Sequence, residues 1–138
     1  MLPLRFRRRW QLANGVLLLC VLVAALAPLA WYWPDRARLG SWFDGSDKWL
    51  HGITFALLAL WFAGQFRRSG LWRIAVGLLA FGVFIELCQR GVGYRSAEWL
   101  DVAADAAGIA AGLAIAALGA VGWSLRFEHW LAGARQTG

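Results

Sequence analysis

Four long apolar runs limit what this chain can fold into more than any other feature of its sequence. They extend approximately over residues 14–33, 50–66, 71–89 and 100–125. A helix of roughly 17–25 apolar residues crosses the hydrocarbon core of a bilayer, where the backbone must satisfy its own hydrogen bonds. A soluble core this small could not bury a chain that is 60% apolar and 16% charged. The sequence therefore predicts an all-α, polytopic membrane protein with a bundle of about four transmembrane helices.

The segments between the runs are too short to form another folded unit, and no long internal repeat is visible. We therefore predict a single transmembrane domain over residues 1–138.

The first run can also be interpreted as a cleaved signal peptide. An Arg cluster precedes it, and Ala25-Leu26-Ala27 resembles a cleavage box. Pro28 would then follow the cut, where its ring and missing N–H fit an extended protease-bound chain poorly. The run is also long for a signal peptide. We therefore expect it to be retained as a spanning helix.

Basic residues indicate the orientation of the chain, because Lys and Arg in short loops favour the cytoplasmic side. Nine of the fourteen lie in the N-terminal arm, the loop after the second run and the tail. The other five lie in the two remaining loops, among acidic residues. Both termini are therefore expected on the cytoplasmic side of the membrane. This orientation and attraction to anionic lipid explain most of the net charge of +6, and no nucleic-acid recognition motif is present.

Aromatic residues agree with these boundaries. Trp72 and Trp123 fall near the predicted inner face, where interfacial anchoring is their expected role. The tail from Trp123 to Trp130 combines apolar and charged residues and is predicted to form a short amphipathic helix along the inner surface.

Ionisable and amide residues gather at the predicted outer ends of the last three runs, and intramembrane residues of this kind usually mark a functional site. Positions three or four apart share a helix face, so each helix presents one polar stripe. Gly108 and Gly112 lie below the carboxylates of the last helix and let a neighbouring helix approach closely. The stripes are therefore expected to meet in one pocket. The candidate residues are Asp47, Lys48, His51, Glu86, Gln89, Arg95, Asp101 and Asp105.

The predicted pocket has an uneven charge, because four carboxyl groups face Lys48 and Arg95, with His51 as a third potential cation. One carboxyl group could hold a proton, His51 could be charged, or a cation or cationic ligand group could bind. The sequence leaves open whether a metal binds and names no cofactor. A salt-bridge network that only fixes helix register is the alternative to a functional site.

Two segments carry a resemblance to a known family: DKWLHGITFALLAL, over 47–60, and IELCQRGVGYRSAEWLDVAADAAGIAAG, over 85–112. They resemble the VanZ-like membrane family in an Asp-Lys-x-x-His helix start, a Glu-x-x-Gln helix end, a following Arg and an Asp before a Gly-bearing helix. Asp105 departs from the pattern, because the family commonly has Asn there. The matching residues are Asp47, Lys48, His51, Glu86, Gln89, Arg95, Asp101 and Gly108.

The resemblance implies a place in the bacterial cell envelope, as a multi-pass protein of the cytoplasmic (inner) membrane, and a link to resistance against the glycopeptide antibiotic teicoplanin. Partners expected on this basis are membrane lipids, a lipid-linked cell-wall precursor or the glycopeptide itself.

Three functions are compatible with this pocket. In a binding module, Asp47, Gln89 and Asp105 contact an amphiphile, while Lys48 and Arg95 hold its anionic headgroup. In an intramembrane enzyme, Glu86 or His51 is the general acid or base, and Asp101 and Asp105 orient a base or a metal. No nucleophile motif supports that enzyme. In a proton-coupled transporter, the same groups form a relay, and four helices per chain would require a homo-oligomer.

Overall fold

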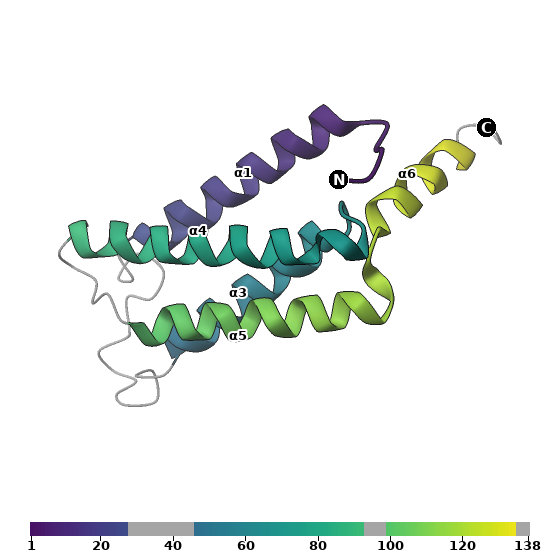
Figure 1. Cartoon of the computed structure of the whole chain (residues 1–138). Helices are drawn as coiled ribbons and strands as arrows, with labels where there is room; N and C mark the ends of the chain where they lie inside the picture. The colour runs from purple at the N-terminus through teal and green to yellow at the C-terminus, as the bar shows by residue number, and fades with distance from the viewer. Residues whose placement is uncertain (28–45, 93–98, 135–138) are drawn as a thin grey trace.

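The computed structural model describes residues 1–27, 46–92 and 99–134, and every element assigned within these ranges is a helix (Figure 1). The elements are α1 Arg7–Leu26, α3 Ser46–Ala63, η3 Arg68–Gly70, α4 Leu71–Val92, α5 Trp99–Ile115, η4 Ala116–Ala120 and α6 Trp123–Ala134. The prediction of an all-α protein is confirmed for the described chain.

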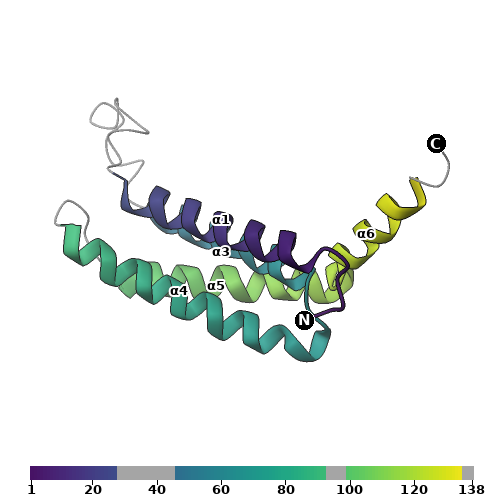
Figure 2. The same ribbon diagram turned by 90° about the horizontal axis from the view of Figure 1, so that it is seen from above.

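Figures 1 and 2 show α1, α3, α4 and α5 lying alongside one another, with the chain direction reversing at each step. We call the end where α3 and α5 begin and α4 finishes the apical end. The opposite end, with the N-terminus, residues 64–70 and α6, is the basal end. Residues far apart in the sequence thus meet at two distinct ends of the molecule.

Among the described residues, three helices are long and apolar enough to cross a membrane: Arg7–Leu26, Arg68–Gly91 and Trp99–Ala120. The apolar part of α3, Lys48–Ala63, is shorter. Large apolar side chains remain exposed on all of these helices, including Leu12, Leu57 and Phe84. Exposure of so much apolar surface is typical of helices that face lipid.

Among the described helices, α3 and α5 have the most extensive contact with each other, and glycine residues allow the short distance between their backbones. A Cβ atom added at Gly108 would lie 2.1 Å from the carbonyl oxygen of Gly52, and one at Gly112 would lie 2.4 Å from that of Ala56. Both distances are far below van der Waals contact, so only glycine fits. The predicted small-residue seam is therefore confirmed, and its partner is α3.

The fourth apolar run does not form one continuous helix to Leu125. It passes from α5 into the π-helical turn η4, leaves helical geometry at Gly119, and turns at Gly122, whose φ of +75° is a left-handed value that favours glycine. The amphipathic tail predicted over 123–130 is helical, as α6. Helix α1 begins at Arg7, before the apolar run itself, because Arg and Gln are good helix formers.

Candidate functional site

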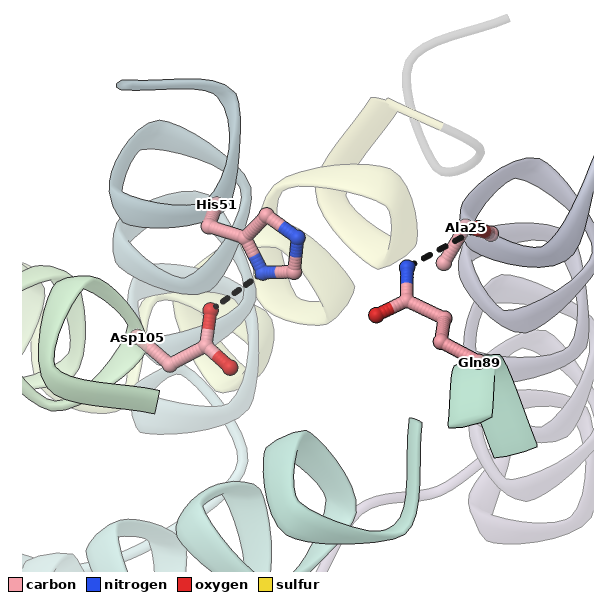
Figure 3. Close-up of polar contacts among 4 residues, drawn as sticks. All are labelled: Ala25, His51, Gln89 and Asp105. Carbon is pink, nitrogen blue, oxygen red and sulfur yellow. Dashed lines mark hydrogen bonds and ion pairs between the residues drawn. The ribbon is translucent and has the colours of Figure 1, made fainter. Parts of the chain in front are cut away.

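At the apical end, the His51 side chain of α3 and the Asp105 side chain of α5 are buried and lie within hydrogen-bond distance of each other (Figure 3). His51 Nδ1 lies 2.9 Å from Asp105 Oδ1, and the two side chains are only 9% and 1% exposed. The second carboxylate oxygen rests against α4, where a Cβ atom added at Gly82 would lie 2.4 Å from Asp105 Oδ2. Three helices therefore hold this carboxylate. A carboxylate at hydrogen-bond distance from one imidazole nitrogen fixes the ring's orientation.

Gln89 approaches the same region from the end of α4 (Figure 3). Its Nε2 donates to the carbonyl oxygen of Ala25 at 3.1 Å, which satisfies a carbonyl in the last turn of α1. That bond fixes the amide orientation and leaves Oε1 on the side of the His51–Asp105 pair. Gln89 is 1% exposed, and Oε1 has no hydrogen-bond partner among the described residues. A buried acceptor of this kind is a candidate ligand contact.

Glu86 and Asp101 are also buried at the apical end, one turn from Gln89 on α4 and from Asp105 on α5. Lys48 is half-buried in the first turn of α3. The predicted stripes on α3, α4 and α5 thus lie at one end and inside the protein. The Asp47 side chain and the whole of Arg95 lie outside the described residues. Within the described ranges, no three His, Cys, Asp or Glu side chains are grouped to hold a metal ion.

The basal end contains a second buried polar group that the sequence did not reveal. Asn14 and Gln65 form a reciprocal pair of amide hydrogen bonds, both 2.8 Å, and the indole N–H of Trp61 donates to Asn14 Oδ1 at 2.8 Å. These bonds join the middle of α1 to the chain just after α3. In hydrocarbon such a pair holds two helices together, because separating them would leave polar groups without partners.

Trp61, which donates to Asn14, belongs to a cluster of three indole rings. The ring centroids of Trp10, Trp61 and Trp123 lie 5.5–5.6 Å apart. A Cβ atom added at Gly64 would lie 2.1 Å from Trp123 Nε1, so glycine makes room for the ring. Trp123 is half-buried: its ring packs against Trp10 and Trp61, and its indole N–H donates to the carbonyl oxygen of Leu60 at 3.2 Å. The predicted interfacial role of Trp123 stays a prediction.

Glu128 of α6 binds the N-terminal segment. Its carboxylate accepts hydrogen bonds from the backbone N–H groups of Arg5 and Phe6, at 2.8 and 3.1 Å, and from the Trp10 indole at 2.9 Å. Burial raises the pKa of Glu128, but these hydrogen bonds and the Arg5 charge outweigh burial and hold the pKa below its usual value. The ionised carboxylate therefore connects α6 to the start of α1.

Comparison of the chain with protein-family models, curated proteins and solved structures gave no match. The resemblance to the VanZ-like family therefore stays a hypothesis that depends on the motif residues, of which His51, Glu86, Gln89 and Asp101 are buried together at the apical end.

Proposed function

We propose that this chain is a multi-pass protein of the bacterial inner membrane that binds the headgroup of an amphiphile, such as a lipid-linked cell-wall precursor or a lipoglycopeptide. The binding site is the apical cluster, which consists of the buried residues His51, Glu86, Gln89, Asp101 and Asp105. The observation that carries the proposal is the buried Gln89 Oε1, which has no hydrogen-bond partner among the described residues and points to the side of the His51–Asp105 pair. An isolated acceptor in an apolar environment costs about 1–3 kcal/mol. A donor group on a ligand would remove this cost.

Several features support this class of ligand. The cluster combines a buried carboxylate, an imidazole and an amide, so it can both donate hydrogen bonds to a sugar or phosphate and accept them. Apolar side chains such as Trp49 and Trp99 are exposed beside it and fit the lipid part of an amphiphile. The VanZ-like resemblance adds the envelope setting and the link to teicoplanin-type antibiotics.

We also propose that α1, α3, α4 and α5 all cross the membrane with both termini in the cytoplasm. The described basic residues of the N-terminal arm, η3 and α6 share the basal end, which supports this orientation (Figure 1). The apical cluster then faces outward.

Single-cysteine labelling tests the orientation in a chain lacking Cys20 and Cys88. A cysteine at the exposed Ser69 should react in intact cells only with a membrane-permeant maleimide, whereas one at the exposed Trp49 should also react with an impermeant maleimide. Reaction of the Ser69 position alone with the impermeant reagent would reverse the orientation and the outward-facing cluster.

Native mass spectrometry of protein purified with its lipids tests the binding function. We expect the wild type to carry an amphiphile of defined mass. Gln89→Met should lower its occupancy about fivefold, because a hydrogen bond to a neutral amide contributes about 1 kcal/mol. Asp105→Asn should lower its occupancy about tenfold or more, because a hydrogen bond to a carboxylate contributes about 1.5–3 kcal/mol. Leu87→Met is the matched control, since Leu87 is exposed on the same helix. Wild-type protein without bound amphiphile, or equal occupancy in all four proteins, would overturn the proposal.

An intramembrane enzyme is the second candidate, favoured by the 2.9 Å approach of His51 Nδ1 to Asp105 Oδ1. A carboxylate that orients an imidazole in this way is a common arrangement for a general base. The same purified amphiphile distinguishes the two functions. Conversion to a product by wild type, but not by Glu86→Gln, would replace the binding function with catalysis.

A further inference from the structure

An apolar groove of about 480 Å³ lies between α1 and α3 and is closed at its basal end by residues from η4 and α6. Leu17 and Val21 contribute from α1, and Leu57 and Leu58 contribute from α3. The single hydroxyl group in the lining belongs to Thr54. A groove with this lining, on helices proposed to cross the membrane, offers contacts to a hydrocarbon chain and almost none to a polar ligand.

The basal end of the groove is a rigid aromatic surface. Trp61 and Trp123 line it, and each has its indole N–H committed to an acceptor within the protein. Trp61 donates to Asn14 Oδ1 at 2.8 Å, and Trp123 donates to the carbonyl oxygen of Leu60 at 3.2 Å. Because the polar edges are satisfied, the rings present apolar surface to the groove. The groove is therefore preformed, which lowers the entropic cost of ordering an occupant.

Two arginines are positioned next to this aromatic surface. Arg126 donates to the carbonyl oxygen of Gly119 at 2.8 Å, and Arg68 donates to that of Ala117. Gly119 precedes the groove-lining Ala120, and Arg126 lies one turn after Trp123 on the same face of α6. Both guanidinium groups are exposed, and each retains further N–H donors, because arginine has five.

The charge around these arginines is strongly positive. Among the described residues of the basal end, Glu128 is the only acidic side chain, and the N-terminal segment occupies its carboxylate. The basic residues at this end are Arg5, Arg7, Arg8, Arg9, Arg67, Arg68, Arg73 and Arg126. A ligand that combines a hydrocarbon chain with a phosphate anion matches both the groove and its charged end.

We propose that the groove between α1 and α3 holds one acyl chain of an anionic glycerophospholipid, whose phosphate is bound by Arg68 and Arg126. The lipid comes from the leaflet at the basal end, so this site is separate from the apical cluster. The proposal depends on the proposed membrane placement but not on the apical ligand. Occupancy of this groove would fix the distance between α1 and α3, which are joined by the hydrogen bond from the Trp61 indole N–H to Asn14 Oδ1.

Lipid titration followed by native mass spectrometry tests this site on the full chain. Phosphatidylglycerol should bind more tightly than phosphatidylcholine with the same acyl chains. Arg126→Gln and Arg68→Gln should each reduce this preference about fivefold, because one arginine near an anionic headgroup contributes about 1 kcal/mol. Arg73→Gln is the charge-matched control, since the Arg73 guanidinium lies over the Trp72 ring.

A second pair of variants tests the acyl chain. Val21→Phe, which fills the groove, should weaken binding of both lipids, whereas Val23→Phe, at an exposed position on the same helix, should not. The melting temperature of each variant without added lipid shows whether it is folded. Equal affinity for the two lipids, equal behaviour of the two phenylalanine variants, or a lipid-free dimer that covers the groove would overturn the proposal. None of these variants alters Gln89 or Asp105, so the result is independent of the amphiphile test at the apical end.

Discussion

Gly108→Ala should destabilise the protein by roughly 3 kcal/mol or more, although it adds only one methyl group. The new Cβ atom would lie 2.1 Å from the Gly52 carbonyl oxygen and 2.8 Å from the Gly52 carbonyl carbon. Both are backbone atoms and cannot rotate away as a side-chain tip can. Relief of the clash requires α5 to move away from α3, which separates the two helices with the most extensive mutual contact among the described helices.

Gly77→Ala is the matched control, because no heavy atom lies within 4 Å of an added Cβ atom there. Loss of a helical glycine should leave that variant unchanged or stabilise it by up to about 1 kcal/mol. Thermal unfolding in one detergent compares the two variants with wild type. Equal melting temperatures for Gly108→Ala and Gly77→Ala would contradict the close α3–α5 approach.

The helices themselves could be predicted because their signal is long and redundant. Each of the four apolar runs contains many residues that agree, and the small residues at Gly108 and Gly112 indicated a close neighbour. The identity of that neighbour could not be predicted, because Gly52 and Ala56 are ordinary members of an apolar run. The predicted end of the fourth helix, at Leu125, was wrong for a similar reason. The sequence stays apolar beyond the break in the helix, whereas the break itself depends on the backbone conformation of Gly119 and Gly122.

The apical cluster could be predicted in outline, because carboxylates at helical spacing in apolar sequence are rare and expensive. The particular pairing of His51 with Asp105 could not, since Asp101 lies one turn away on the same face of α5. The buried amide pair at the basal end could not be predicted from any sequence pattern. Asn14 and Gln65 are isolated amides 51 positions apart, and the tryptophans near them in sequence could be explained as interfacial anchors, because tryptophan is enriched at membrane interfaces.

The His51–Asp105 pair should behave as one energetic unit. His51→Leu removes the imidazole and leaves a carboxylate that is 1% exposed without this partner, at a cost of about 3–5 kcal/mol. Asp105→Asn removes the charge, keeps the shape that fits against Gly82, and restores the residue common in the VanZ-like family. It should therefore be the milder change. Adding it to His51→Leu should recover part of the lost stability, because the buried charge is then gone.

Unfolding free energies of the two single variants and the double variant measure this coupling directly. We expect the double variant to be at least about 1 kcal/mol more stable than the sum of the single effects implies. Simple additivity would mean that the two side chains do not interact.

The stability of Asp105→Asn also decides how a change in its amphiphile occupancy is interpreted. If Asp105→Asn lowers occupancy while the protein stays folded, the carboxylate acts on the ligand. If Asp105→Asn unfolds the protein as strongly as Gly108→Ala, the cluster holds the helices in register, and the proposed binding function loses its residue-level support.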